Sequence, residues 1–211
     1  MMKRIETGGI GYLERLAGSD WLWGSDYTSG DLYEAEELWR QGHRIRKNRL
    51  VLVHQPDGRA IWPIEAKNGQ YFGRPACVGG EIILLLADFP AGEARLLAFD
   101  EETGTAPPLA VLPLADITDC YNLMPHGAPL MLTRQTGEEF EIVWPERSRF
   151  AIAPQESFSH REGERLFFSR WAEDPDYRET VVERRYPTGE ILAEYDGAIL
   201  DLPDGGHWLL V

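Results

Sequence analysis

Residues 81–92 read EIILLLADFPAG, an apolar run that ends in a turn. The run has the length and apolar content of a buried strand, and residues 90–92 have the chemistry of a hairpin turn. Four further apolar runs, each followed by a turn, are Trp21–Tyr27, Arg49–Gln55, Leu130–Gln135 and Arg165–Trp171. The pattern predicts a protein built mainly from antiparallel strands.

More strands are predicted after these turns. Second strands are expected at Ala60–Ile64, Ala94–Phe99, Phe140–Trp144 and Tyr177–Tyr186. Third, weaker strands are expected at Leu109–Leu114, Phe150–Ala153 and Ile191–Tyr195. Near the end of the chain, Ala198–Leu202 and Trp208–Val211 flank a further turn. Several strands per unit therefore recur along the sequence.

The units begin near residues 21, 50, 81, 130 and 165, with a partial copy at 208. A repeat of roughly 40 residues with several strands in each unit resembles the five-bladed β-propellers. The resemblance covers about residues 20–211 and carries no motif of a specific propeller family. It implies an all-β, five-bladed β-propeller that the C-terminal strand, Trp208–Val211, closes. A β-sandwich or an open barrel is the alternative.

One segment has helical rather than strand periodicity. Residues 31–41, DLYEAEELWRQ, place apolar residues at helical spacing. Asp31 is suited to cap the N-terminus and Gly42 to end the helix. We expect one short helix at 31–41, whose acidic face could bind a protein partner.

Composition restricts the class of protein. With 21 Lys and Arg against 35 Asp and Glu, the chain has a net charge of −14, so we expect no nucleic-acid partner and no binding to an anionic membrane. Cys77 and Cys120 form no metal-ligand pattern. No N-terminal apolar run typical of a signal peptide and no membrane-spanning run is present. The sequence therefore predicts a cytoplasmic chain with a lead-in at 1–19 and a single domain at 20–211, without a metal or cofactor.

A polar residue lies near the end of each of the five apolar runs. These strand-end residues are Asp26, His54, Asp88, Arg134 and Arg170. In a propeller, the innermost strands run side by side along the central channel. Their ends would therefore meet at one mouth, where guanidinium groups suit a carboxylate or phosphate and a histidine can carry a proton. The alternative is that strands simply end in polar residues where they reach solvent.

Aromatic residues accompany the same strand ends. Trp23, Tyr27 and Trp171 could stack on a ligand at the mouth, or they could pack between blades. Together with the strand-end residues, they define the predicted ligand-binding site.

Three functions are consistent with these patterns. The first is a non-enzymatic binding or scaffold module that holds a small polar ligand or a peptide at the channel mouth. The second is a hydrolase acting on a carbohydrate or lactone through Asp26, Asp88 and His54. The third is a protein adaptor that uses the helix at 31–41. The absence of a catalytic motif favours the first function, the binding or scaffold module. No catalytic residues are predicted for it.

Overall fold

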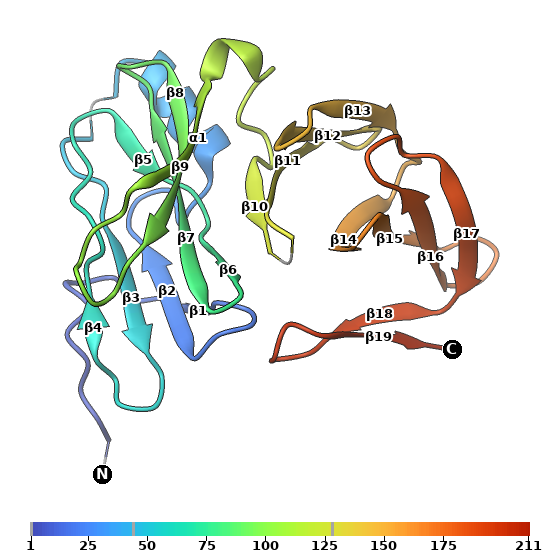
Figure 1. Cartoon of the computed structure of the whole chain (residues 1–211), viewed down its shortest axis with the longest axis horizontal. Helices are drawn as coiled ribbons and strands as arrows, with labels where there is room; N and C mark the ends of the chain where they lie inside the picture. Colours follow the sequence, from blue (N-terminus) through green and yellow to red (C-terminus); the bar gives the residue numbers. More distant parts are fainter. Residues whose placement is uncertain (1, 44, 128) are drawn as a thin grey trace. The chain divides into compact units, whose positions relative to one another are not determined.

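The computed structural model describes residues 2–43, 45–127 and 129–211 (Figure 1). Their strands form one five-stranded sheet, three four-stranded sheets and one two-stranded hairpin. All pairings are antiparallel, and each large sheet uses strands that are near neighbours along the chain, as in a propeller blade. The expectation of an all-β architecture of blade-like sheets with one short helix is confirmed. Among the described residues, no helix is both long and apolar enough to span a membrane.

The chain divides into two compact units, Met1–Cys120 and Tyr121–Val211. The first sheet of unit 1 has the order β1 (Glu14–Arg15), β2 (Trp21–Ser25), β3 (Leu50–His54) and β4 (Ala60–Ile61). The second has the order β5 (Gln70–Phe72), β7 (Glu81–Asp88), β8 (Glu93–Phe99) and β9 (Pro108–Pro113), and β6 (Ala76–Val78) also pairs with β7. A single 3-10 turn, η1 (Leu114–Asp116), follows β9.

The core of unit 1 lies between these two sheets. One buried hydrophobic cluster combines side chains of β2 and β3 with side chains of β5, β7 and β8, including Trp23, Leu52, Phe72 and Leu84. The opposite face of β3 packs against the N-terminal lead-in through Val51, Val53 and Ile10. Because β3 is covered on both faces, its sequence is a continuous apolar run rather than an alternating one.

The predicted helix is present as α1 (Leu32–Arg40). The Asp31 carboxylate caps it by accepting hydrogen bonds from the backbone N–H groups of Tyr33 and Glu34. Leu32 and Ala35 form the buried side of the helix. The helix lies in the connection between β2 and β3.

Unit 2 contains two four-stranded sheets. The first has the order β10 (Met124–His126), β11 (Met131–Gln135), β12 (Glu139–Trp144) and β13 (Ser148–Ala151). The second has the order β14 (Glu156–Glu162), β15 (Arg165–Ala172), β16 (Arg178–Arg185) and β17 (Ile191–Asp196). Their shared core is aromatic, because Phe140 lies within 5.4 Å, centroid to centroid, of Phe150, Phe158 and Phe168.

The number of blades differs from the prediction. The runs at Trp21–Tyr27 and Arg49–Gln55 belong to one sheet, because β2 pairs with β3 from Trp21–His54 to Ser25–Leu50. The connection between them contains the helix and is long, so the two strands of one sheet were predicted as the first strands of two blades. Four large sheets result, where five blades were expected.

The chain ends in the C-terminal hairpin, which consists of β18 (Ala198–Asp201) and β19 (His207–Leu210). The predicted closing strand lies in β19, whose strand partner among the described residues is β18. Closure by this strand is therefore not observed. The turn at 203–206 folds β19 directly back on β18, so local pairing already satisfies that side of its backbone.

Candidate functional site

Four of the five strand-end residues lie in or directly after the second strand of a sheet, β2, β7, β11 or β15, whereas His54 lies in β3, the third strand of its sheet. Each of the five predicted strands is the second or third strand of its sheet, because a short or polar first strand precedes it. In addition, β2 and β3 run antiparallel, so Asp26 follows one end of the pair and His54 lies at the other. Asp26 lies opposite Arg49, so five residue steps separate it from His54, a distance of about 17 Å.

Asp26 fastens the two ends of the connection that contains the helix. Its Oδ1 accepts hydrogen bonds from the Asn48 side chain at 3.0 Å and from the Arg49 backbone at 2.7 Å. Its Oδ2 accepts from Arg49 Nε at 2.7 Å. The carboxylate is thus fully engaged within unit 1.

Asp88 is also held internally. The residue is buried at the end of β7, where Oδ2 accepts a hydrogen bond from Gln70 at 2.6 Å and lies 3.1 Å from the Arg95 guanidinium. Its Oδ1 accepts from the Ala91 backbone and shapes the following turn. His54 pairs instead with Asp57 at 2.8 Å.

The two arginines lie in different sheets of unit 2. Arg134 is buried on β11, with Glu139 at 3.7 Å. Arg170 is partly exposed on β15 and pairs with Glu194 at 2.9 Å. Both guanidinium groups therefore have acidic partners from their own sheets.

The predicted aromatic residues have different surroundings. Trp23 is buried in the core of unit 1 and is therefore a packing residue. Tyr27, at a positive φ of 60°, and Trp171 are exposed. Among the described residues of each unit, no hydrogen bond or ion pair that we observe joins one predicted site residue to another. Their convergence across the two units remains a prediction.

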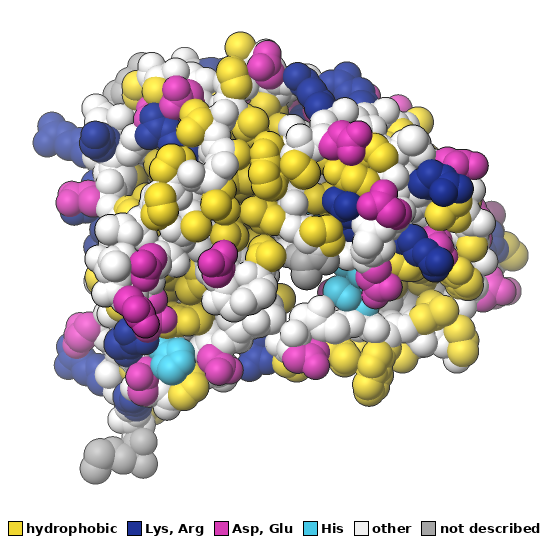
Figure 2. Space-filling model, viewed as in Figure 1, with side chains coloured by type: hydrophobic (Ala, Val, Ile, Leu, Met, Phe, Trp, Pro, Cys, Tyr) yellow, Lys and Arg dark blue, Asp and Glu magenta, His cyan; other side chains and the backbone are white. Residues whose placement is uncertain are grey.

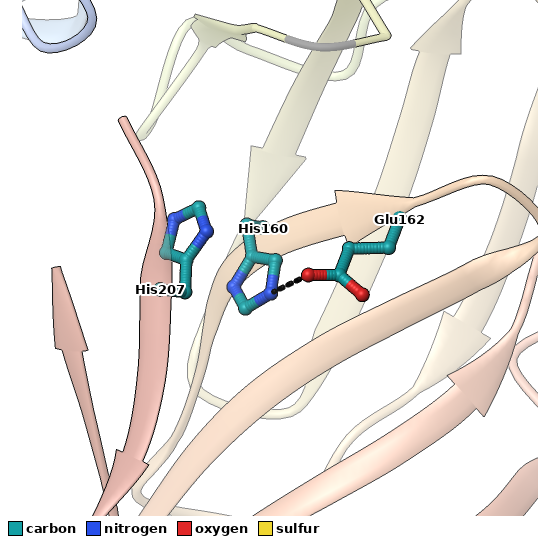
Figure 3. Close-up of side chains that lie close together, drawn as sticks. All are labelled: His160, Glu162 and His207. Atoms are coloured by element: carbon teal, nitrogen blue, oxygen red, sulfur yellow. Dashed lines mark ion pairs between the residues drawn. The ribbon is translucent and has the colours of Figure 1, made fainter. Parts of the chain in front are cut away.

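A cluster that was not predicted lies in unit 2 and consists of His160, Glu162 and His207 (Figure 3). One potential ligand atom from each residue lies within 4.8 Å of the others. His160 and Glu162 belong to β14, and His207 belongs to β19 of the C-terminal hairpin. We call these three residues the histidine cluster.

A β-bulge aims His160 into this cluster. On β14, Phe158 pairs with Phe168, but His160 pairs with Phe167, so Ser159 is an extra residue. Without the bulge, Phe158 and His160 would point to the same face. The bulge leaves Phe158 in the aromatic core and turns His160 to the opposite face of the sheet.

The His160 ring lies between two other rings. It stacks on Phe167 with a centroid distance of 4.7 Å, and on His207 with 3.5 Å and an interplanar angle of 3°. Burial, with a contribution from the nearby His207, lowers the pKa of His160 to about 4. The ring is therefore neutral at pH 7, and one of its nitrogens carries a free lone pair.

The C-terminal hairpin has two different faces. His207 and Asp201 lie on the face turned toward β14, together with Ile199 and Leu209. The other face carries Leu200, Trp208 and Leu210, which are 40%, 60% and 47% exposed. Figure 2 shows hydrophobic side chains gathered at the surface over this hairpin. An apolar face of this kind commonly marks a contact surface.

Cys120 is not an activated nucleophile. Burial, followed by the negative charges of Glu36 and Asp119, raises the pKa of this thiol to about 12. At pH 8 only about one molecule in 10,000 would carry the thiolate. Glu36 also accepts a hydrogen bond from the Cys120 backbone and pairs with Arg40, so this acidic residue of α1 is engaged inside unit 1.

We expect the native protein to resist thiol labelling at Cys120. In Cys77→Ser, Ellman's reagent at pH 8 should release almost no thiolate until guanidinium unfolds the chain, and should then report one equivalent. Cys120→Ser, which keeps the less buried Cys77, is the matched control and should react slowly in the native state. Rapid labelling of native Cys77→Ser would contradict this assignment.

Comparisons with known proteins identify no family. No family model and no curated protein matches the sequence. An acylaminoacyl peptidase from Pyrococcus horikoshii is similar in structure, with a TM-score of 0.48 and 11% identity over 95% of this chain and 35% of that chain. A chain from Bacteroides uniformis assigned as a 6-phosphogluconolactonase gives a TM-score of 0.43 and 10% identity over 92% of this chain and 60% of that chain. This chain thus spans less than two thirds of either structure, and neither activity is carried over to it.

Proposed function

We propose that this chain is a non-enzymatic binding module that holds an extended peptide on its C-terminal hairpin. The observation that carries the proposal is the apolar face formed by Leu200, Trp208 and Leu210. Of the two ligand classes expected from the sequence, the peptide has more support than the small polar ligand. The strand-end residues that would bind a polar ligand already have acidic, basic or amide partners inside their own units.

The edges of the hairpin favour a peptide in the extended conformation. Among the described residues, neither β18 nor β19 pairs with a further strand. A free strand edge offers a row of backbone N–H and C=O groups that an added strand can satisfy. Such a strand would extend the two-stranded hairpin to a sheet of three strands.

The charge of this region selects the partner. From Tyr186 to Val211 the sequence contains no Lys or Arg, and it contains five acidic residues: Glu190, Glu194, Asp196, Asp201 and Asp204. Glu190 and Glu194 pair with Arg185 and Arg170, so the acidic residues nearest the hairpin turn, Asp201 and Asp204, carry the charge argument. A peptide that alternates apolar and basic residues would place its apolar side chains beside Trp208. Its basic side chains would then lie on the face that carries Asp201. We therefore propose an apolar and basic peptide segment as the ligand class.

A labelled peptide of alternating Val and Lys, ten residues long, tests this proposal. We expect it to bind the full chain in fluorescence anisotropy. Trp208→Ser should weaken binding by at least about tenfold, equivalent to about 1.4 kcal/mol. A peptide of alternating Val and Glu should bind more weakly than the Lys peptide.

Trp171→Ser is the matched control, because Trp171 is also an exposed tryptophan of unit 2 but lies on β15. This variant should bind the Lys peptide as the unmodified chain does. The proposal fails if Trp208→Ser binds with unchanged affinity. It also fails if Trp171→Ser alone loses binding, which would favour the predicted channel-mouth site.

A further inference from the structure

We propose that the histidine cluster, His160, Glu162 and His207, binds a divalent transition-metal ion such as Zn²⁺. The inference goes beyond peptide binding and does not depend on it. It rests on three side chains, from two strands distant in the sequence, whose potential ligand atoms lie within 4.8 Å of one another.

The donor set suits a metal of this class. Two imidazole nitrogens and one carboxylate oxygen are ligands that Zn²⁺, Ni²⁺ and Cu²⁺ bind well, whereas Mg²⁺ and Ca²⁺ prefer oxygen alone. A tetrahedral Zn²⁺ with bonds of about 2.1 Å separates its ligand atoms by about 3.4 Å. His160 Nε2 and Glu162 Oε1 are already 3.5 Å apart, so this pair matches that spacing (Figure 3).

The third ligand must move to reach the ion. The rings of His160 and His207 are parallel, so their in-plane lone pairs do not converge on one point. The His207 side chain is partly exposed on the last strand, which leaves room for its ring to rotate. Metal binding therefore replaces the stacked arrangement of the rings with a crossed one.

Groups around the cluster can orient the ligands. Ser159 Oγ lies 2.9 Å from His160 Nδ1 and can accept a hydrogen bond from the Nδ1–H group, which leaves the lone pair of Nε2 for the ion. Asp201 Oδ1 lies 3.6 Å from His207 Nε2 and supplies a second carboxylate at the same place. Oxygen partners of this kind typically fix the ring orientation of metal-binding histidines.

A metal at this position would fasten the C-terminal hairpin to the sheet β14–β17. His160 and Glu162 belong to the sheet, and His207 belongs to the hairpin. The ion would thus replace a contact between stacked rings with coordinate bonds between the two elements.

Zinc titration of the full, untagged and chelator-treated chain tests the proposal in the absence of any peptide. We expect one equivalent of Zn²⁺ to bind in calorimetry, and no binding of Mg²⁺. His207→Phe should keep the ring stack but lose a metal ligand. Loss of a residue that only orients a ligand typically lowers metal affinity by about 10- to 100-fold, and we expect the loss of His207 to lower zinc affinity by more than that. Glu162→Gln, at an exposed position, should also weaken binding.

His43→Ala is the matched control, because His43 is an exposed histidine outside the histidine cluster. It should bind zinc as the unmodified chain does, and zinc should shift the NMR signals of His160 and His207 but not those of His43. The proposal is overturned if the unmodified chain binds no zinc, or if His207→Phe binds it with unchanged affinity. Since peptide binding is measured without metal, either proposal can fail alone.

Discussion

Arg184→Ala is expected to lower the free energy of unfolding by about 3–5 kcal/mol. The Arg184 guanidinium forms two bonds with the Glu156 carboxylate, at 2.7 and 3.1 Å, and the Glu156 side chain is completely buried. Removal of the arginine leaves a carboxylate without its counter-charge inside the protein. Urea denaturation followed by far-UV circular dichroism measures the loss.

Two further variants separate the cost of an unpaired charge from the value of the pair. Glu156→Leu combined with Arg184→Met should be much less destabilising than Arg184→Ala, because no charge is left buried. A small loss should remain, since the Ala153 N–H and the Gly189 carbonyl lose their partners. Arg185→Ala, which breaks an exposed pair with Glu190, should cost no more than about 1 kcal/mol. Equal losses for Arg184→Ala and Arg185→Ala would contradict the expected role of burial.

Phe140→Ala is expected to cost about 3–5 kcal/mol of unfolding free energy. The ring is fully buried and contacts three other phenylalanines, which come from both sheets of unit 2. Its removal would leave a cavity between two blades whose other walls are rigid aromatic rings. The same denaturation experiment measures this effect.

Phe140→Leu keeps most of the volume and should cost only about 1–2 kcal/mol. Tyr177→Ala, at an exposed aromatic residue of the same unit, should change stability by less than about 1 kcal/mol. If Phe140→Ala behaved like Tyr177→Ala, the aromatic core would not be the main contact between the sheets of unit 2.

The apolar strands could be predicted because a buried strand is a short continuous run of apolar residues, which is visible in the sequence. β7 and β8 are the clearest examples, since both are rich in aliphatic residues and a turn separates them. The first strand of each sheet was missed because it is either short, as in β1, β5 and β10, or polar. β14, with the sequence ESFSHRE, is mostly polar, and it is recognised as a strand only by its pairing with β15.

The predicted number of blades was wrong, and the predicted site, whose convergence stays a prediction, was derived from the same assumption. Both assumed that each apolar run begins a new sheet. The pairing of β2 with β3 across a long connection cannot be read from local periodicity, and it places Asp26 and His54 at opposite ends of one sheet. The histidine cluster depends on a bulge and on a contact between residues 160 and 207. The alternation of His160 and Glu162 was the only local signal for it.

The connection between β2 and β3 has a consequence for the chain entropy of folding. Closing residues 26–49 costs about 1.6 kcal/mol more than closing a four-residue turn, because the loss of chain freedom grows with the logarithm of loop length. Asp26 and Asn48, at the two ends of the connection, are hydrogen-bonded to each other, and Asn48 also accepts the N–H of Phe72. These hydrogen bonds offset the entropic cost of closing the loop at the point where its two ends meet. They also make the pairing of the first sheet depend on contacts with β5, so the two sheets of unit 1 are coupled in their folding.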